Sequence, residues 1–268
     1  MTYRVLLVSV LFAVLAFLLT PMVVVAIASF NAGPVMEFPP RALTMRWYEA
    51  IRPEFYHAAL VSLGVAASTT ALALLLGLPA GLALCRGRFP CRAAIGALCL
   101  SPLMVPALVT GVALYQSALV LWDFTGIMLG GTLPGIVAGH MLFGIPFVIR
   151  AVVAGHARLD PALEEAAQNL GAAPVRAFLL TALPVLRPAI VSGAVFAFAM
   201  SFDDVPIALF MGGGDWATTL PVQIFTAVQF NLSADVMAIS AVVVVVSFAA
   251  VAVLNRMTGS ELFFGARS

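Results

Sequence analysis

Long apolar segments separated by short polar ones dominate this sequence. A helix that crosses a lipid bilayer needs about 20 consecutive, mostly apolar residues, and six segments of the chain reach that length. Some contain proline or glycine, which membrane helices tolerate where neighbouring helices satisfy the freed backbone groups. The pattern therefore predicts an all-α, polytopic membrane protein with a single transmembrane domain over residues 1–268. The predicted spans are about 5–30, 58–84, 93–121, 132–153, 189–211 and 235–255.

Composition supports a membrane protein. The chain is 63% hydrophobic and only 9% charged, whereas about a quarter of the residues in ordinary soluble domains are charged. Most of the surface must therefore face lipid. The net charge of +1 gives no electrostatic reason to expect a nucleic-acid partner. Cys85, Cys91 and Cys99 have no C-x-x-C spacing, so they predict neither a zinc site nor a redox motif.

The placement of arginine predicts how the chain is oriented in the membrane. Cytoplasmic segments of membrane proteins carry an excess of Lys and Arg. With the N-terminus inside, ten of the thirteen basic residues fall in inner segments and three fall in one outer loop. Both termini are therefore predicted to be cytoplasmic. The inner set is Arg4, Arg86, Arg88, Arg92, Arg150, Arg158, Arg176, Arg187, Arg256 and Arg267, and the outer set is Arg41, Arg46 and Arg52.

The longest cytoplasmic loop, residues 154–188, begins with the pattern of a short amphipathic helix. Asp160 can cap the free backbone N–H groups, Pro161 fits the first helical position, and Gly171 suits the end of the helix. Helices that rest on lipid headgroups usually carry Lys or Arg on their polar face. The polar face here favours docking on a protein instead. It is formed by Glu164, Glu165, Gln168 and Asn169.

A second short helix is predicted to begin at Pro174 in the same loop. Pro184 and Pro188 are expected to end it before the fifth span. Helices of this length are marginal alone in water. We therefore expect both loop helices to need a partner surface, either in the rest of this chain or in another protein.

The loop resembles a motif of a known transporter family. Glu165-Ala166-Ala167, three variable residues, Gly171 and a hydrophobic run to Leu183-Pro184 resemble the EAA loop of ABC importer permeases. In that family the loop forms a coupling helix that sits in a groove of the cytoplasmic ATPase subunit. The resemblance therefore implies that ATPase coupling is carried by Glu164, Glu165, Ala166, Ala167 and Gly171.

Three further stretches resemble the second permease subunit of spermidine/putrescine-type importers: Thr44–Tyr48, Ser201–Val205 and Leu220–Phe225. One position departs, because Leu103 stands where those permeases can carry an acidic residue. The resemblance implies a type I ABC importer permease fold in the bacterial inner membrane. It also implies a homologous second permease, a periplasmic or lipid-anchored substrate-binding protein, and two copies of an ATPase subunit. The ATPase would bind ATP and Mg, so no cofactor is expected in this chain.

Asp203 and Asp204 lie within the fifth predicted span. An ionised carboxylate near the centre of a membrane helix costs about 2.5–3.5 kcal/mol, so both should face water, protein or a substrate path. One interpretation places them on the path of a cationic amine, and the other pairs them structurally with an arginine or helix termini in a partner subunit. Aromatic side chains could add cation–π attraction along such a path; the candidates are Phe202, Trp47 and Trp122.

The predicted function is thus a permease subunit of an ATP-driven importer for a polyamine or related amine. The alternatives are an ion-gradient-driven secondary transporter, or a permease of the same family for a solute other than a polyamine. An intramembrane enzyme is disfavoured, because neither H-E-x-x-H nor G-x-S-x-G occurs. The chain has no Walker A loop, and His57, His140 and His156 have no metal-ligand spacing. We therefore expect no catalytic or metal-binding residues.

Overall fold

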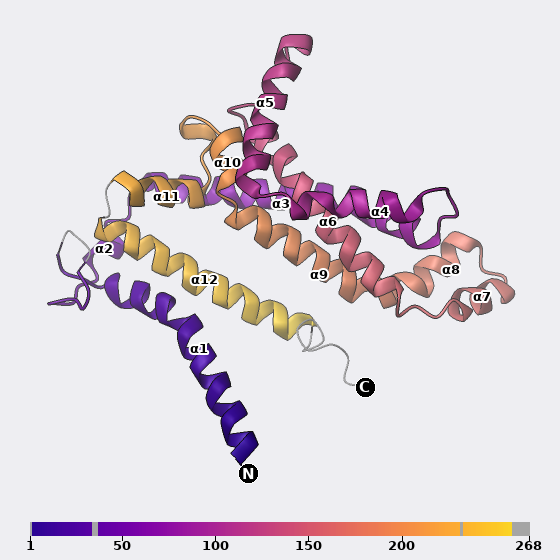
Figure 1. The fold of residues 1–268 in the computed structure, drawn as a ribbon, viewed down its shortest axis with the longest axis horizontal. Coiled ribbons are helices and arrows are strands. Elements are labelled where there is room, and N and C mark those ends of the chain that lie inside the picture. The colour runs from indigo at the N-terminus through magenta and orange to yellow at the C-terminus, as the bar shows by residue number, and fades with distance from the viewer. Residues whose placement is uncertain (1, 34–36, 231–232, 259–268) are drawn as a thin grey trace. The chain divides into compact units, whose positions relative to one another are not determined.

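The computed structural model describes residues 2–33, 37–230 and 233–258, and its elements are helices (Figure 1). An isolated antiparallel bridge joins Asn31 and Leu43. The all-α class is therefore confirmed. Arg267, one of the arginines predicted to be cytoplasmic, lies outside the described residues.

In chain order the α-helices are α1 (Thr2–Ala28), α2 (Arg46–Glu49), α3 (Pro53–Arg86), α4 (Arg92–Leu100), α5 (Ala107–Thr125), α6 (Leu133–His156), α7 (Ala162–Asn169), α8 (Pro174–Leu180), α9 (Ala182–Asp203), α10 (Pro206–Met211), α11 (Leu220–Phe230) and α12 (Ala234–Thr258). The short 3-10 turns are η1 (Ser101–Met104) and η2 (Asp215–Ala217).

The helices form two compact units. The first contains the described residues up to His57 and from Gln223 onward, and the second contains residues 58–222. Within the first unit, α1 and α2 both contact α12. The most apolar stretch of α1 buries none of its residues inside the protein, as expected for a helix whose surroundings are lipid. The single domain over residues 1–268 stays a prediction.

Five helices of the described chain are long and apolar enough to cross a membrane. Each coincides with one of the six predicted spans or with a large part of it. The sixth predicted span, 235–255, lies within α12. The five long helices are α1, α3, α5, α6 and α9.

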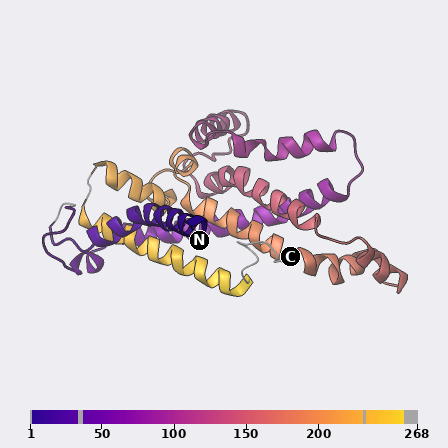
Figure 2. The same ribbon diagram turned by 60° about the horizontal axis from the view of Figure 1, so that its bottom comes forward.

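The predicted span 93–121 is not one continuous helix. Helix α4 ends at Leu100, the turn η1 follows, and α5 begins only at Ala107. Pro106 explains the break, since a proline disfavours helical backbone in the residue before it, and Val105 is extended with ψ of 134°. Figures 1 and 2 show α4 and α5 running in different directions.

The fifth predicted span, 189–211, is also divided. Helix α9 begins seven residues earlier than predicted, at Ala182, and α10 follows a break at Asp204. The expectation that Pro184 and Pro188 precede the span is wrong, because both lie inside α9. Pro184 is tolerated there because the first turn of a helix has N–H groups without intrahelical partners.

The hydrophobic pattern does not predict α11. This helix has only 11 residues and follows a glycine-rich turn, so it is too short to resemble a membrane span. Its first backbone N–H, that of Leu220, donates a hydrogen bond of 2.8 Å to the Ser62 hydroxyl of α3. This contact helps to fix where α11 begins. Because its two residues are 158 positions apart, the local sequence does not reveal it.

In the second unit, small residues let the long helices approach closely. Gly77 and Gly81 of α3 form a G-x-x-x-G pair against α6. A Cβ atom added at Gly77 would lie 2.8 Å from Cβ of Val148, and one at Gly81 would lie 2.9 Å from Cβ of Val152. In membranes such small-residue faces allow the backbone contact that holds helices together.

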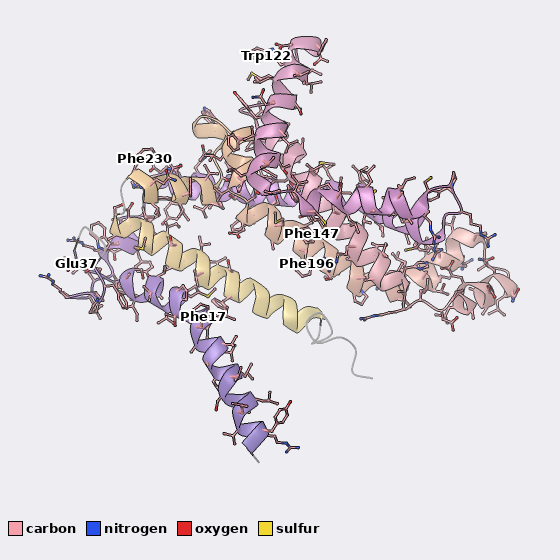
Figure 3. All side chains as sticks on the ribbon, viewed as in Figure 1. Phe17, Glu37, Trp122, Phe147, Phe196 and Phe230 are labelled. Carbon is pink, nitrogen blue, oxygen red and sulfur yellow. The ribbon has the colours of Figure 1, made fainter. Side chains whose placement is uncertain are left out.

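Helices α6 and α9 lie side by side in the same unit. Gly193 of α9 faces the backbone of Val148, where a Cβ atom would be only 3.1 Å from Cα. Figure 3 shows Phe147 of α6 and Phe196 of α9 near each other, with ring centroids 6.0 Å apart and planes inclined by 14°. This close pairing brings polar residues of the two helices into contact.

Candidate functional site

The first candidate region is the break between α9 and α10. Helix α9 ends at Asp203, and Asp204 has extended backbone with ψ of 128°. Oδ1 of Asp204 accepts hydrogen bonds from the backbone N–H of Ile207 at 2.8 Å and of Ala208 at 3.1 Å. These are donors that the start of a helix leaves unsatisfied. The Asp204 side chain therefore caps α10 within its own chain.

His140 of α6 lies against the same break. Its Nδ1 is 2.7 Å from the Ser201 hydroxyl, and its Nε2 is 3.3 Å from Oδ1 of Asp204. All three residues are buried. Among the described residues Nε2 has no well-aligned hydrogen-bond acceptor, so its contact with Asp204 is one of charge and dipole. The sequence gives no sign that Asp204 is a neighbour of His140.

Asp203 has the opposite environment. It is exposed, whereas Asp204 is only 6% exposed. Within the part of the chain that the structure describes, the Asp203 carboxylate accepts no hydrogen bond and forms no ion pair. The two acids are thus separated by their surroundings, with one carboxylate used inside the protein and the other directed outward.

The aromatic candidates are scattered. Phe202 stacks on Phe198 of the same helix, with centroids 6.0 Å apart. Figure 3 shows Trp122 near the end of α5, away from α9. Trp47 belongs to the first unit, where its indole N–H donates to the backbone carbonyl of Asn31 at 2.9 Å. Within the second unit, Phe202 is the neighbour of Asp203 in the chain, whereas Trp122 lies on another helix.

The second candidate region is the loop that contains α7 and α8. Oδ1 of Asp160 accepts a hydrogen bond of 2.9 Å from the Ala162 N–H, as the predicted cap requires. At the other end, Ala172 N bonds to the Ala167 carbonyl and Gly171 N bonds to the Gln168 carbonyl. This is the Schellman arrangement, which places the residue at Gly171 in left-handed backbone. Gly171 accordingly has φ of +92°.

The two adjacent glutamates of α7 differ in solvent exposure. The Glu164 carboxylate is largely covered and forms a salt bridge with Arg86 at the end of α3, whereas Glu165 is exposed. Large apolar side chains at α7 are exposed, since Leu163 is 46% exposed and Leu170, at its C-terminal end, is 90% exposed. The helix therefore presents Glu165 and apolar side chains outward.

The described residues hold no group of three or more His, Cys, Asp or Glu side chains arranged to bind a metal ion.

Comparison with known proteins defines the class. The fold matches a solved bacterial ABC transporter that imports the acidic polysaccharide alginate, with a TM-score of 0.69 and 14% identity, over 95% of this chain and 96% of that one. The sequence is 33% identical over 230 residues to the putrescine transport system permease protein PotI of Escherichia coli K12, covering 85% of this chain and 81% of PotI. It is 29% identical over 250 residues to the spermidine/putrescine transport system permease protein PotC of Haemophilus influenzae, covering 92% and 94%.

These likenesses define a membrane-spanning permease subunit of an ABC importer. Residues 4–259 match the family described as binding-protein-dependent transport system inner membrane component, and the chain belongs to that family. It is therefore a multi-pass protein of the inner membrane, and the predicted class is confirmed. The family assignment favours an ATP-driven importer over the ion-gradient alternative.

Proposed function

We propose that this chain forms half of the translocation pathway for a small cationic solute, a polyamine or a related amine. The relatives PotI and PotC are named for putrescine and spermidine transport, which supports this class of substrate. The observation that carries the proposal is the state of Asp203, an exposed carboxylate without a hydrogen bond or ion pair among the described residues.

Electrostatic attraction favours a cationic amine at Asp203, at the break between α9 and α10. A carboxylate attracts an ammonium group more strongly in a partly dehydrated cavity than in water, because the effective dielectric constant is lower. The ring of Phe202 is adjacent in the chain and could add cation–π attraction. We assign the substrate contact to Asp203 and Phe202. Asp204 is left out because its carboxylate caps α10, and Trp122 because it lies near the end of α5, away from α9.

We further propose that α7 is the coupling helix. Its exposed Glu165, Ala166 and Leu170 suit a groove on a cytoplasmic ATPase subunit. In the assembled importer, two copies of that ATPase would bind ATP and Mg and push on the coupling helices. A homologous permease would complete the pathway, and a substrate-binding protein would deliver the solute from outside.

The test is uptake by the purified importer. The chain would be tagged, purified with its ATPase and second permease, and reconstituted in liposomes with its binding protein and internal ATP. We expect ATP-dependent uptake of labelled putrescine, competed by spermidine and not by an anionic sugar acid. A complex that hydrolyses ATP and transports only anionic or neutral solutes would overturn the polyamine assignment while leaving the coupling role intact.

A further inference from the structure

One arginine at the end of α3 contacts three elements of the cytoplasmic loop region. The guanidinium of Arg86 donates to both carboxylate oxygens of Glu164 on α7, with Nη1 to Oε2 at 3.1 Å. Its Nε donates to Nε2 of His156, the last residue of α6, at 3.3 Å. The same guanidinium lies over the Phe178 ring of α8, 5.0 Å from the centroid.

The geometry of this contact requires arginine. A guanidinium presents paired N–H groups that match the two oxygens of a carboxylate, and its flat face can stack on an aromatic ring. A lysine ammonium would supply the charge but neither the paired bonds nor the stacking. The Glu164 side chain is 16% exposed and that of Arg86 is 35% exposed, so water screens the pair less than it screens an ordinary surface ion pair.

Helix α7 depends on such a contact for its position. It has only eight residues, and helices of that length are marginal without tertiary contacts. Its chain neighbours are α6 and α8, whereas Arg86 is 78 residues away from Glu164 in sequence. Arg86 therefore connects α7 to α3, whose Gly77 and Gly81 pack closely against α6.

We propose that Arg86 is a positioning residue that transmits movement of α7 to α3 during the transport cycle. Glu164 is its partner inside the chain, and Glu165 is left free for the ATPase. The two adjacent glutamates of the loop thus have different tasks, although the family resemblance implies ATPase coupling for both. This inference rests on the proposed coupling role of α7.

The experiment compares four variants in the reconstituted importer: Arg86→Ala, Glu164→Ala, the double variant, and the charge exchange R86E/E164R. Arg88→Ala is the matched control, because Arg88 follows two residues after Arg86, is exposed, and has no hydrogen bond or ion pair among the described residues. The measurements are co-purification of the ATPase subunit, ATP hydrolysis, and solute transported per ATP hydrolysed.

We expect the two single variants to keep the ATPase bound and to transport several-fold less solute per ATP. The double variant should be no worse than either single one, because both remove the same interaction. The charge exchange should recover part of the loss.

Two results would overturn the inference. The single variants could behave like Arg88→Ala, or Glu164→Ala alone could release the ATPase, which would place Glu164 in the docking surface. If the unmodified chain fails to co-purify with any ATPase, the proposed function itself fails, and that outcome is distinct from both.

Discussion

Nε2 of His140 lies 3.3 Å from Oδ1 of Asp204, the oxygen that also accepts the backbone N–H groups of Ile207 and Ala208. One buried carboxylate oxygen thus holds the start of α10 and faces the imidazole of α6. Asp203, the preceding residue, is exposed. We therefore expect substitutions of Asp203 to change transport and substitutions of Asp204 to change stability.

The first prediction concerns uptake kinetics. Asp203→Asn should raise the half-saturation concentration for a cationic solute, because it removes the charge while keeping the size of the side chain. ATPase co-purification and basal ATP hydrolysis should stay unchanged. The measurement is the initial rate of uptake against solute concentration in proteoliposomes. Unchanged kinetics for Asp203→Asn would end the substrate-contact proposal.

The second prediction concerns stability at the same break. Asp204→Ala removes the cap of α10, and losing a helix cap costs about 0.5–2 kcal/mol. Asp203→Ala should have little effect, because among the described residues its carboxylate accepts no hydrogen bond. Thermal unfolding of the detergent-solubilised protein would compare the two. Equal midpoints would show that the Asp204 cap contributes nothing to folding.

The third prediction concerns the end of α7. Gly171 has φ of +92°, and a Cβ atom added there would meet nothing within 4 Å. Gly171→Ala should therefore weaken the helix end through backbone strain of roughly 1–2 kcal/mol and not through a clash. Gly171→Asn should be milder, since asparagine is sometimes found at this position. The readout is ATPase co-purification, and a weaker effect of alanine than of asparagine would contradict the backbone explanation.

The fourth prediction tests the packing of α3 on α6. Gly77→Leu and Gly81→Leu should lower the yield of folded permease, because each side chain would clash with Val148 or Val152. Gly64→Leu on the same helix is the control, since a Cβ atom there meets nothing within 4 Å. Size-exclusion profiles of the three variants would measure this. Similar profiles for all three would argue against a close α3–α6 contact in the membrane.

The fifth prediction concerns orientation. Reporter fusions within residues 31–57 and 212–234 should report the periplasm, and fusions at Arg88 and His156 should report the cytoplasm. The first loop is the sharper test, because it holds Arg41, Arg46 and Arg52. A cytoplasmic signal from that loop would reverse the predicted topology and remove α7 from the side of the ATPase.

The sequence by itself determined the helical class, most of the long apolar segments and the limits of α7. It could do so because apolar length, the Asp160 cap and the Gly171 helix end depend on residues within one or two turns. The break before Pro106 follows from an equally local rule, yet hydropathy alone joins α4 and α5 into one span.

Only the tertiary structure decided which polar side chains meet. His140 and Ser201 are 61 residues apart, and Arg86 and Glu164 are 78 residues apart. Nothing in the local pattern links such pairs, because their contact depends on how closely α3, α6 and α9 pack. The same packing distinguishes Asp203 from Asp204 and Glu164 from Glu165. Glu164 and Glu165 are adjacent on a helix and point about 100° apart, whereas Asp204 lies beyond the end of α9. In both pairs, only the arrangement of neighbouring helices decides which carboxylate is covered.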